Sequence, residues 1–240
     1  MSVAVVTGGA SGIGLATVRE FVSASHFVHV IDIDEKALEA CQSEFGSQSV
    51  VTHCKDVSEL QTWKDLSQVI GGELDVLVHN ALFVKVQDIS EQEYAHWRRH
   101  FDVMLDSVFF SVQMLRNALK DSHGSLVLVS SVHSGIGLPG HSAYAAVKGG
   151  LISLGRQLAV EFGPEIRVNT VIPGPIMTQV WQDVDQTGIT KTIESTVLKR
   201  MGTPADVAAA IAFLSSGKAA YITGAELVID GGWSIGKSSS

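Results

Sequence analysis

The sequence contains few cysteines, few basic residues and no long hydrophobic run. Cys41 and Cys54 are its only thiols, too few for a disulfide framework. Its 17 Lys and Arg residues are outnumbered by 25 Asp and Glu residues, and the net charge of -8 disfavours nucleic acids and anionic membranes as partners, since both favour a basic face. The longest apolar run, residues 207–214, is far shorter than the ~20 residues of a membrane-spanning helix.

The chain reaches its first apolar strand without a charged start or a cleavable apolar segment. Together with the two thiols, this predicts a cytoplasmic, reduced protein. A chain of 240 residues with 45% hydrophobic residues can bury one large core. We find no internal repeat and no linker, so we expect a single domain over residues 1–236, followed by a flexible tail at 237–240.

A glycine-rich turn follows the first strand. Residues 2–6 run directly into the sequence TGGASGIG at 7–14, and a helical stretch over 15–21 comes next. Glycine lets the backbone approach a pyrophosphate closely, and the free N–H groups of the helix point at the anion. Such a turn is a weak signal alone, but strand, turn and helix in this order predict a dinucleotide site. The residues expected to hold the cofactor there are Gly8, Ser11, Gly12, Ile13 and Gly14.

An acidic residue ends the second strand, which covers residues 27–31. Asp32 is placed to accept hydrogen bonds from the ribose hydroxyls of NAD, and it would repel the 2′-phosphate of NADP. Because Ile33 stands where an NADP site usually has arginine, we predict NAD. Two alternatives remain: Asp32 is only a helix N-cap or turn residue, although Asp34 is the better cap, or Lys36 meets a phosphate rather than solvent.

Strand-like apolar runs alternate with helical stretches along the rest of the chain. This alternation predicts an α/β fold with a doubly wound, Rossmann-like parallel sheet and helices on both faces. Ligands of such sheets bind at the carboxyl ends of the strands. The residues that end or follow each run therefore form the candidate site, although each taken alone is more often a turn former. The runs are 50–53, 74–78, 125–129, 167–172 and 226–229, and the site residues are Asp56 near adenine, Val57, Asn80 on the adenosine side, Ala81, Ser130, Ser131, Pro173 and Gly174.

A tyrosine and a lysine four residues apart carry the candidate chemistry. Tyr144 and Lys148 share one face of a helix expected over 142–162, and Ser131 ends a buried strand upstream. Lowering a tyrosine pKa from about 10 to about 7 requires roughly 4 kcal/mol, which a unit charge about 4 Å away supplies at an effective dielectric of about 20. We therefore expect Lys148 to lower the pKa of Tyr144 and to grip the nicotinamide ribose. Tyr144 would exchange a proton with an alcohol or carbonyl oxygen that Ser131 orients.

These motifs resemble the short-chain dehydrogenase/reductase family over essentially the whole chain. The motifs are TGxxxGIG at 7–14, Asp56-Val57, His79-Asn80-Ala81-Leu82, Ser131, Tyr144-x-x-x-Lys148 and Pro173-Gly174-x-Ile176-x-Thr178. The resemblance implies one domain with a parallel sheet of about seven strands. It also implies contacts from Ile176 and Thr178 to the nicotinamide carboxamide and a substrate loop at about 175–203. The family usually assembles as a homotetramer or homodimer built on helices such as the one that bears Tyr144.

The chain departs from the family pattern at three positions. His79 and Leu82 replace an asparagine and a glycine, so we expect a bulkier wall beside the cofactor. Met104 stands where the family commonly has a catalytic asparagine, which holds a water in the proton relay behind the lysine. A thioether is only a weak acceptor. We expect Ser107, one turn further along the helix, or a backbone carbonyl to hold that water instead.

The family geometry also implies which side chains surround the substrate. Most of them are apolar, which favours a secondary alcohol or ketone with an apolar or cyclic body over a charged sugar phosphate. The two histidines among them either bind a polar substituent or face solvent. The residues are Phe83, Val84, His133, Ile136, Leu138, His141, Val180 and Trp181.

Two functions of different classes fit these residues. The first is an NAD-dependent alcohol dehydrogenase or carbonyl reductase that acts on a small molecule, and the three residues with proton chemistry favour it. The second is an NAD(H)-binding protein with little turnover, acting as a sensor or partner subunit, and only the three departures from the family pattern support it. The histidines are scattered and no Cys-x-x-Cys pair occurs, so we expect no metal.

Overall fold

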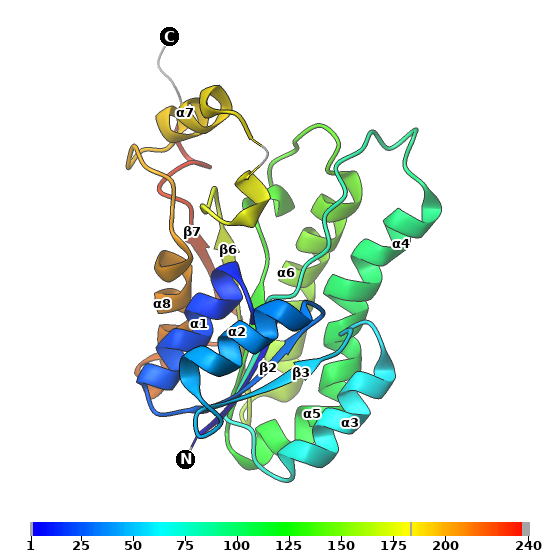
Figure 1. Ribbon diagram of the computed structural model, residues 1–240, viewed down its shortest axis with the longest axis vertical. Helices are drawn as coiled ribbons and strands as arrows, with labels where there is room; N and C mark the ends of the chain where they lie inside the picture. Colours follow the sequence, from blue (N-terminus) through cyan, green and yellow to red (C-terminus); the bar gives the residue numbers. More distant parts are fainter. Residues whose placement is uncertain (1, 183, 237–240) are drawn as a thin grey trace.

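Parallel strands form the centre of the computed structural model, which describes residues 2–182 and 184–236 (Figure 1). The seven strands lie in the order β3-β2-β1-β4-β5-β6-β7. The predicted α/β fold with a doubly wound, Rossmann-like sheet is confirmed, whereas the tail predicted at 237–240 lies outside the described residues. The strands are β1 (Val3–Thr7), β2 (Phe27–Asp32), β3 (Val50–Cys54), β4 (Val76–His79), β5 (Ser125–Val129), β6 (Arg167–Pro173) and β7 (Glu226–Ile229).

Helices connect the strands and cover both faces of the sheet. They are α1 (Gly12–Ser23), α2 (Glu35–Phe45), α3 (Leu60–Ile70), α4 (Tyr94–Phe101), α5 (Ser107–Asp121), α6 (Ser142–Phe162), α7 (Gln186–Ser195) and α8 (Pro204–Ser215). A π-helical segment, η1 (Asp102–Asp106), joins α4 to α5. The short 3-10 helices are η2 (Val132–Ser134), η3 (Gln179–Trp181) and η4 (Gly217–Ala219).

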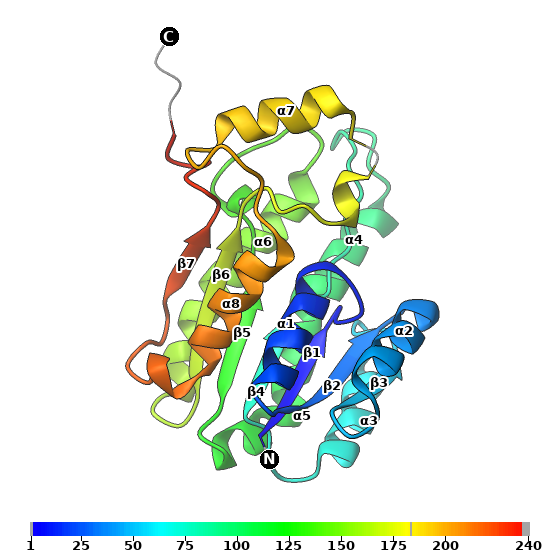
Figure 2. The same ribbon diagram turned by 60° about the vertical axis from the view of Figure 1, so that its left-hand side comes forward.

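Each face of the sheet has its own apolar core. Trp63 of α3 and Leu151 of α6 pack on one face, and Phe21 of α1 and Ile211 of α8 pack on the other. Helices α1 and α8 lie side by side on this second face (Figure 2). Every residue of β5 is buried between the two layers, which explains its continuous apolar sequence.

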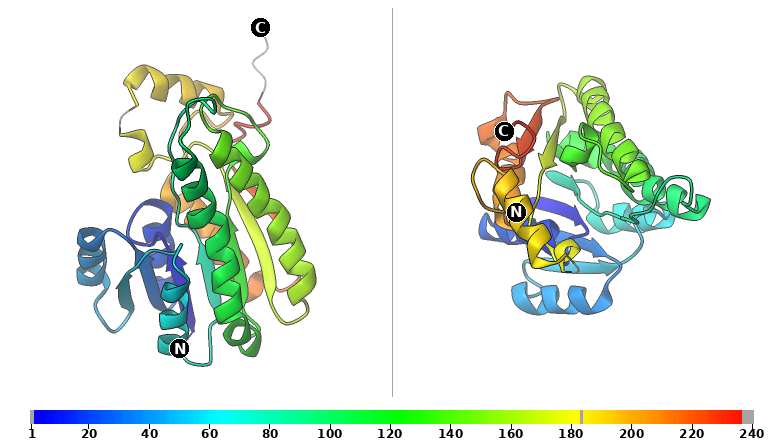
Figure 3. Two further views of the ribbon diagram at one scale, coloured as in Figure 1. Left: turned by 90° about the vertical axis from the view of Figure 1, so that its right-hand side faces the viewer. Right: turned by 90° about the horizontal axis from the view of Figure 1, so that it is seen from above.

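The strand order reverses between β1 and β4. The chain moves outward from β1 through β2 to β3 and then returns to β4 on the other side of β1. The loops after β1 and β4 therefore diverge at the carboxyl end of the sheet, the place where α/β proteins bind ligands. Helix α7 lies above this end (Figures 2 and 3). Within the described ranges, no helix is long and apolar enough to cross a membrane.

Candidate active site

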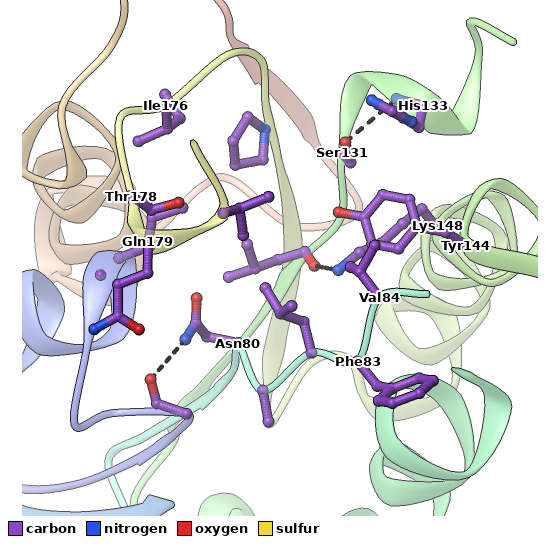
Figure 4. Close-up of a pocket in the computed structure, with 18 of the residues that line it drawn as sticks. Asn80, Phe83, Val84, Ser131, His133, Tyr144, Lys148, Ile176, Thr178 and Gln179 are labelled. Carbon is purple, nitrogen blue, oxygen red and sulfur yellow. Dashed lines mark hydrogen bonds between the residues drawn. The ribbon is translucent and has the colours of Figure 1, made fainter. Parts of the chain in front are cut away.

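A cavity of about 1010 Å³ lies at the carboxyl end of the sheet, and Figure 4 shows a part of it around Tyr144. Two of the predicted site residues, Gly14 and Ile136, do not line it. The predicted residues that do line it are Gly8, Ser11, Gly12, Ile13, Asp32, Asp56, Val57, Asn80, Ala81, Phe83, Val84, Ser130, Ser131, His133, Leu138, His141, Tyr144, Lys148, Pro173, Gly174, Ile176, Thr178, Val180 and Trp181.

The glycine-rich turn packs so closely against the loop after β4 that a side chain at Gly8 is excluded. Gly8 has a φ of +59°, and a Cβ on it would lie 2.9 Å from the Cα of Ala81. Gly14 lies in the first turn of α1 and packs against the glycine-rich turn, because a Cβ on it would collide with the carbonyl oxygen of Gly8. Helix α1 begins at Gly12, which lines the cavity, so the unpaired N–H groups of its first turn lie there. The turn thus fits a dinucleotide pyrophosphate.

Asn80 holds the glycine-rich turn in place. Its side-chain amide donates to the carbonyl oxygens of Thr7 at 3.1 Å and of Gly8 at 3.0 Å. In return, the Thr7 hydroxyl oxygen accepts from the backbone N–H groups of Asn80 and Ala81, both at 3.0 Å. These bonds connect the ends of β1 and β4 across the reversal of strand order. The sequence indicated Asn80 as a cofactor residue, but not this structural task.

Asp32 at the end of β2 is held by backbone N–H groups. One carboxylate oxygen accepts from Ala10 at 3.1 Å, and the other accepts from Ile33 at 2.8 Å and Asp34 at 3.2 Å. The N-cap of α2 is Asp34, which accepts from the backbone N–H of Ala37 at 3.0 Å. Asp32 therefore does not cap the helix, and its fixed carboxylate lines the cavity. This geometry fits the acceptance of hydrogen bonds from two ribose hydroxyls.

The lysine that lies beside Asp32 in the cavity differs from the one considered in the sequence. Lys36 does not line the cavity, whereas Lys55 does. The backbone N–H of Lys55 donates to the carbonyl oxygen of Asp32 at 2.9 Å, and its Nζ lies 3.4 Å from a carboxylate oxygen of Asp65. The pairing of β2 with β3 brings Lys55 to this position.

Asp56 forms a three-residue cluster with Arg99 and Ser58. Arg99 of α4 donates to Asp56 at 2.5 Å and to the Ser58 hydroxyl at 2.6 Å. Ser58 in turn donates from its hydroxyl to Asp56 at 2.7 Å. Arg99 also lines the cavity, a role that the sequence did not reveal. No local signal marks it, because the chain between β4 and α4 lacks regular structure and the position of α4 depends on tertiary packing.

Ser131, Tyr144 and Lys148 converge on one part of the cavity (Figure 4). The Ser131 hydroxyl oxygen accepts from the backbone N–H of His133 at 3.3 Å, and the Ser131 side chain is hydrogen-bonded to Tyr144. The Lys148 ammonium donates to the carbonyl oxygen of Val129 at 2.7 Å and lies 5.4 Å from the centre of the Tyr144 ring. Because Ser131 already accepts from His133, its own proton is available to Tyr144 or to a substrate oxygen.

Burial sets the protonation of this pair, and it corrects one expectation. It raises the pKa of Tyr144, and the hydrogen bond from Ser131 offsets only part of that rise. Burial also lowers the pKa of Lys148 to about 7. The expected fall in the Tyr144 pKa is therefore not found, because a low-dielectric site disfavours the charged forms of both groups. Lys148 is buried, and charges interact strongly in such a low-dielectric place. An added charge would therefore shift the pKa of either group strongly.

Met104 lies at the centre of the π-helical segment η1 and is buried. Its neighbour Val103 lines the cavity, whereas Met104 does not. The Ser107 hydroxyl donates to the carbonyl oxygen of Val103 at 2.7 Å, so Ser107 is left with only its acceptor capacity. Local π-helical turns are frequent at functional sites. Here the π-helical turn has the apolar side chain of Met104 at its centre, and not a polar one.

The other two departures from the family pattern lie in different surroundings. His79 is buried in the core, where its Nε2 is 2.7 Å from the Ser111 hydroxyl, and it does not line the cavity. Ser111 donates to the carbonyl oxygen of Val108 at 2.8 Å, so Nε2 of His79 carries the proton. The bulkier wall expected from His79 is therefore wrong, since its side chain packs against Trp63 instead. Leu82 does line the cavity and is half-exposed.

The substrate end of the cavity is largely apolar. His133 is half-buried there, and its Nδ1 is buried with no hydrogen-bond partner among the described residues. Burial, together with the nearby His141 and Lys148, lowers the pKa of His133 to about 4, so the ring is neutral at pH 7. Nδ1 of His141 bonds the carbonyl oxygen of Pro139 at 2.8 Å. Lys191, Thr192 and Ser195 of α7 also line the cavity and lie in the segment predicted as the substrate loop, whereas Trp233, another lining residue, lies outside that segment.

Helix α4 carries a His-x-x-x-His pair, His96 and His100, so the description of the histidines as scattered was incomplete. His100 uses both ring nitrogens internally: Nδ1 bonds the carbonyl oxygen of His96 at 2.7 Å, and Nε2 accepts from the backbone N–H of Lys85 at 3.3 Å. His100 therefore has no ring nitrogen left to bind a metal ion together with His96. In the part of the chain that the structure describes, no group of three or more His, Cys, Asp or Glu side chains is placed to hold a metal ion.

Comparison with known proteins places this geometry among oxidoreductases. A family model described as enoyl-(acyl carrier protein) reductase matches residues 8–234. A cyclopentanol dehydrogenase from Comamonas sp. is 33% identical over 96% of both chains. A 3-oxoacyl-(acyl-carrier-protein) reductase from Haemophilus influenzae is 34% identical over 96% of this chain and 97% of its own length. A solved structure from Brucella melitensis, described as a short-chain dehydrogenase/reductase of glucose/ribitol dehydrogenase type, has a TM-score of 0.90 at 31% identity and covers 97% of this chain and 96% of its own.

Proposed function

The chain belongs to the short-chain dehydrogenase/reductase family of oxidoreductases, and from this we propose that it is an NAD-dependent enzyme that interconverts a secondary alcohol and a ketone. The observation that carries the proposal is the convergence of Ser131, Tyr144 and Lys148 in the cavity that the glycine-rich turn also lines. A protein that only binds a dinucleotide has no need of a tyrosine, a serine and a lysine at the place where substrate would meet nicotinamide.

Each of the three residues has a distinct task in this proposal. A nicotinamide, when bound, supplies the hydride acceptor or donor and, in its oxidised form, a positive charge. Tyr144 exchanges a proton with the substrate oxygen, and Ser131 donates a hydrogen bond to that same oxygen. Lys148 is held by the Val129 carbonyl, so its ammonium stays beside the tyrosine. Positive charge from the lysine and the oxidised ring together favours the phenolate, against the effect of burial.

Asp32 supports NAD as the cofactor. Its carboxylate is fixed by backbone N–H groups and has oxygen atoms available to ribose hydroxyls, whereas a 2′-phosphate at the same place would be repelled. Lys55 lines the cavity nearby, but its ammonium lies beside Asp65. The site therefore favours two hydroxyls over a phosphate.

The substrate proposed is an alcohol or ketone with an apolar or cyclic body. Phe83, Val84, Leu138, Val180 and Trp181 line the cavity, and Phe83 and Val84 lie near Tyr144 (Figure 4). These apolar side chains favour an uncharged substrate body over a heavily charged one. The similarity to a cyclopentanol dehydrogenase agrees with this class.

Assembly of two or four copies in the cytoplasm completes the proposal. The segment η1 and the helices α5 and α6 form a shallow groove on the surface, in which Phe109 is 54% exposed. The groove is lined by Leu105, Asp106, Phe109, Gly150, Ser153, Leu154 and Gln157. An exposed aromatic side chain in a surface groove suits contact with the same face of a second copy.

One observation favours a second function, that of an NAD(H)-binding protein with little turnover. Met104 is buried at the position of the relay asparagine and offers no good water ligand. This alternative predicts normal binding of NADH without oxidation of any alcohol.

The two functions are separated by titrating the protein with NADH and NADPH and then following NADH formation with a panel of cyclic and open-chain secondary alcohols. Wild-type turnover that Tyr144→Phe reduces at least 100-fold, with NADH affinity unchanged, supports the dehydrogenase, since general acid–base groups contribute about 10²–10⁴-fold. Tight NADH binding with no turnover across the panel overturns it in favour of the second function.

A further inference from the structure

Arg99 joins helix α4 to the loop between β3 and α3, at the end of the cavity where Asp32 and Val57 also lie. We propose that Arg99 is a positioning residue for the cofactor: it fixes the Asp56 carboxylate as an acceptor for the adenine base. The proposal rests on the proposed function only in requiring an adenine dinucleotide as the ligand.

The contacts of Asp56 leave its carboxylate a single orientation. One oxygen accepts from the backbone N–H of Ser58 at 2.9 Å and from the Ser58 hydroxyl at 2.7 Å. The other accepts from Arg99 at 2.5 Å. Arg99 also donates to Ser58 at 2.6 Å, so the three side chains close a ring of hydrogen bonds. The planar guanidinium favours such two-point contacts, which an ammonium cannot reproduce.

The backbone of this loop is secured without Arg99. The Thr62 hydroxyl donates to the carbonyl oxygen of Asp56 at 2.6 Å, and the Trp63 indole donates to that of Val57 at 2.8 Å. Both donors belong to α3, and Trp63 is fully buried in the core. Loss of Arg99 should therefore release one oxygen of the Asp56 carboxylate, the one that Ser58 does not hold, while the loop keeps its path. The contribution of Arg99 is thus to orientation more than to folding.

The position of Arg99 on α4 separates it from an ordinary surface arginine. Arg99 lies one helical turn before Val103, and both residues line the cavity. Its neighbour Arg98 does not line the cavity and bonds Asp102 at 2.8 Å and Asp106 at 3.1 Å, on a more exposed face. Arg98 is therefore a matched control: it has the same charge, helix and kind of partner, but does not contact the cavity.

Without Arg99 the Asp56 carboxylate would also carry an uncompensated charge toward the ligand. The exocyclic amine of adenine needs an acceptor, and a carboxylate that Ser58 holds through one oxygen alone meets it only part of the time. Arg99 balances this charge and holds the acceptor still, so its effect should appear in binding of the adenine half alone.

The test is calorimetric titration of wild type, Arg99→Gln, Arg99→Lys and Arg98→Gln with ADP-ribose and with reduced nicotinamide mononucleotide, which lacks adenine. We expect Arg99→Gln to weaken ADP-ribose binding about tenfold, the loss of one well-placed contact. Arg99→Lys should restore part of the affinity, and Arg98→Gln should match wild type. Affinity for the mononucleotide should be the same in all four proteins. In turnover, the KM for NAD should rise about tenfold with kcat unchanged.

Unchanged ADP-ribose affinity in Arg99→Gln overturns the proposal, and so does an equal loss of affinity for the mononucleotide, which would reveal a general distortion. The double variant Arg99→Gln/Asp56→Asn should bind ADP-ribose no more weakly than the weaker single variant, whereas additive losses would show that the two residues act independently. If no alcohol is oxidised but the ADP-ribose loss is seen, the enzyme assignment falls and the role of Arg99 stands. A wild-type protein that does not bind ADP-ribose overturns both.

Discussion

The Lys148 ammonium donates a hydrogen bond to the carbonyl oxygen of Val129 at 2.7 Å, and both residues are buried. This bond ties the middle of α6 to the end of β5 and keeps the ammonium 5.4 Å from the centre of the Tyr144 ring. A charged lysine inside the protein is costly even with one good acceptor. The residue is therefore retained at the expense of stability.

Replacement of Lys148 by methionine should stabilise the protein in a pH-dependent way. Burial lowers the pKa of Lys148 to about 7, while an unfolded lysine has a pKa of about 10.4. Between these values only the unfolded chain holds the proton, so wild-type stability rises with pH through this window. The free energy of unfolding of Lys148→Met should exceed that of wild type most at pH 6, and the difference should shrink above pH 7. Urea unfolding at pH 6 and pH 9 measures this, and a constant difference would contradict it.

The double variant Asp32→Ser/Ile33→Arg should change the cofactor preference. It removes the carboxylate that repels a 2′-phosphate and adds a guanidinium that pairs with one. The ratio of NADPH to NADH affinity should rise at least tenfold, which corresponds to ~1.4 kcal/mol. Fluorescence titration with both cofactors measures the ratio. Lys36→Gln should leave it unchanged, because Lys36 does not line the cavity; a shift there would place the phosphate site elsewhere.

Met104→Asn tests whether a proton relay through this position limits the reaction. Met104 is buried and does not line the cavity, so the amide of asparagine has no evident partner there. We expect turnover within a few-fold of wild type and a stability loss of about 1–3 kcal/mol. Turnover and urea unfolding of the same preparation separate the two effects. A large gain in turnover would show that the missing asparagine limits wild type.

Phe109→Glu should disrupt self-association. Phe109 is 54% exposed on the surface groove of α5 and α6. In a dimer with a two-fold axis through this groove, the introduced glutamate of one copy would be buried without a partner and would face the same glutamate of the other copy. Light scattering during size-exclusion chromatography should show smaller particles than wild type. Val69→Glu, which places the same charge on the exposed face of α3, should leave the mass unchanged. Equal masses for all three proteins would locate the interface on another surface.

Much of the fold follows from the sequence because the strands of a covered sheet are continuous apolar runs. β5 and β7 have their predicted bounds, and α6 spans the predicted residues 142–162. The site residues that follow strands could be predicted equally well, since the carboxyl ends of parallel strands share one edge of the sheet. The sequence could not show that the His79 side chain points into the core. In a strand buried on both faces, the residue pattern does not indicate which face of the sheet a side chain lies on.

The residues that the sequence missed depend on contacts between distant segments. Arg99 reaches Asp56 across 43 positions of the chain, and Lys55 reaches Asp32 through the pairing of β2 with β3. The pKa of Tyr144 was misjudged for a related reason: charge proximity could be estimated from helical spacing, but the depth of burial could not. Local patterns locate elements and motifs, whereas desolvation and cross-chain pairing require the assembled structure.

The two ends of the cavity are built from different stretches of the chain. Apart from the residues after β5 and β6 that hold the nicotinamide in our proposal, the cofactor end draws on segments before η1 ends. The substrate end draws mainly on the loop after β5, on η3 and on α7, while Phe83 and Val84 come from the loop after β4. Recombination between relatives near the end of β5 would therefore exchange most of the substrate wall while leaving the choice of cofactor intact. Such a division allows new specificities to evolve without rebuilding the hydride chemistry.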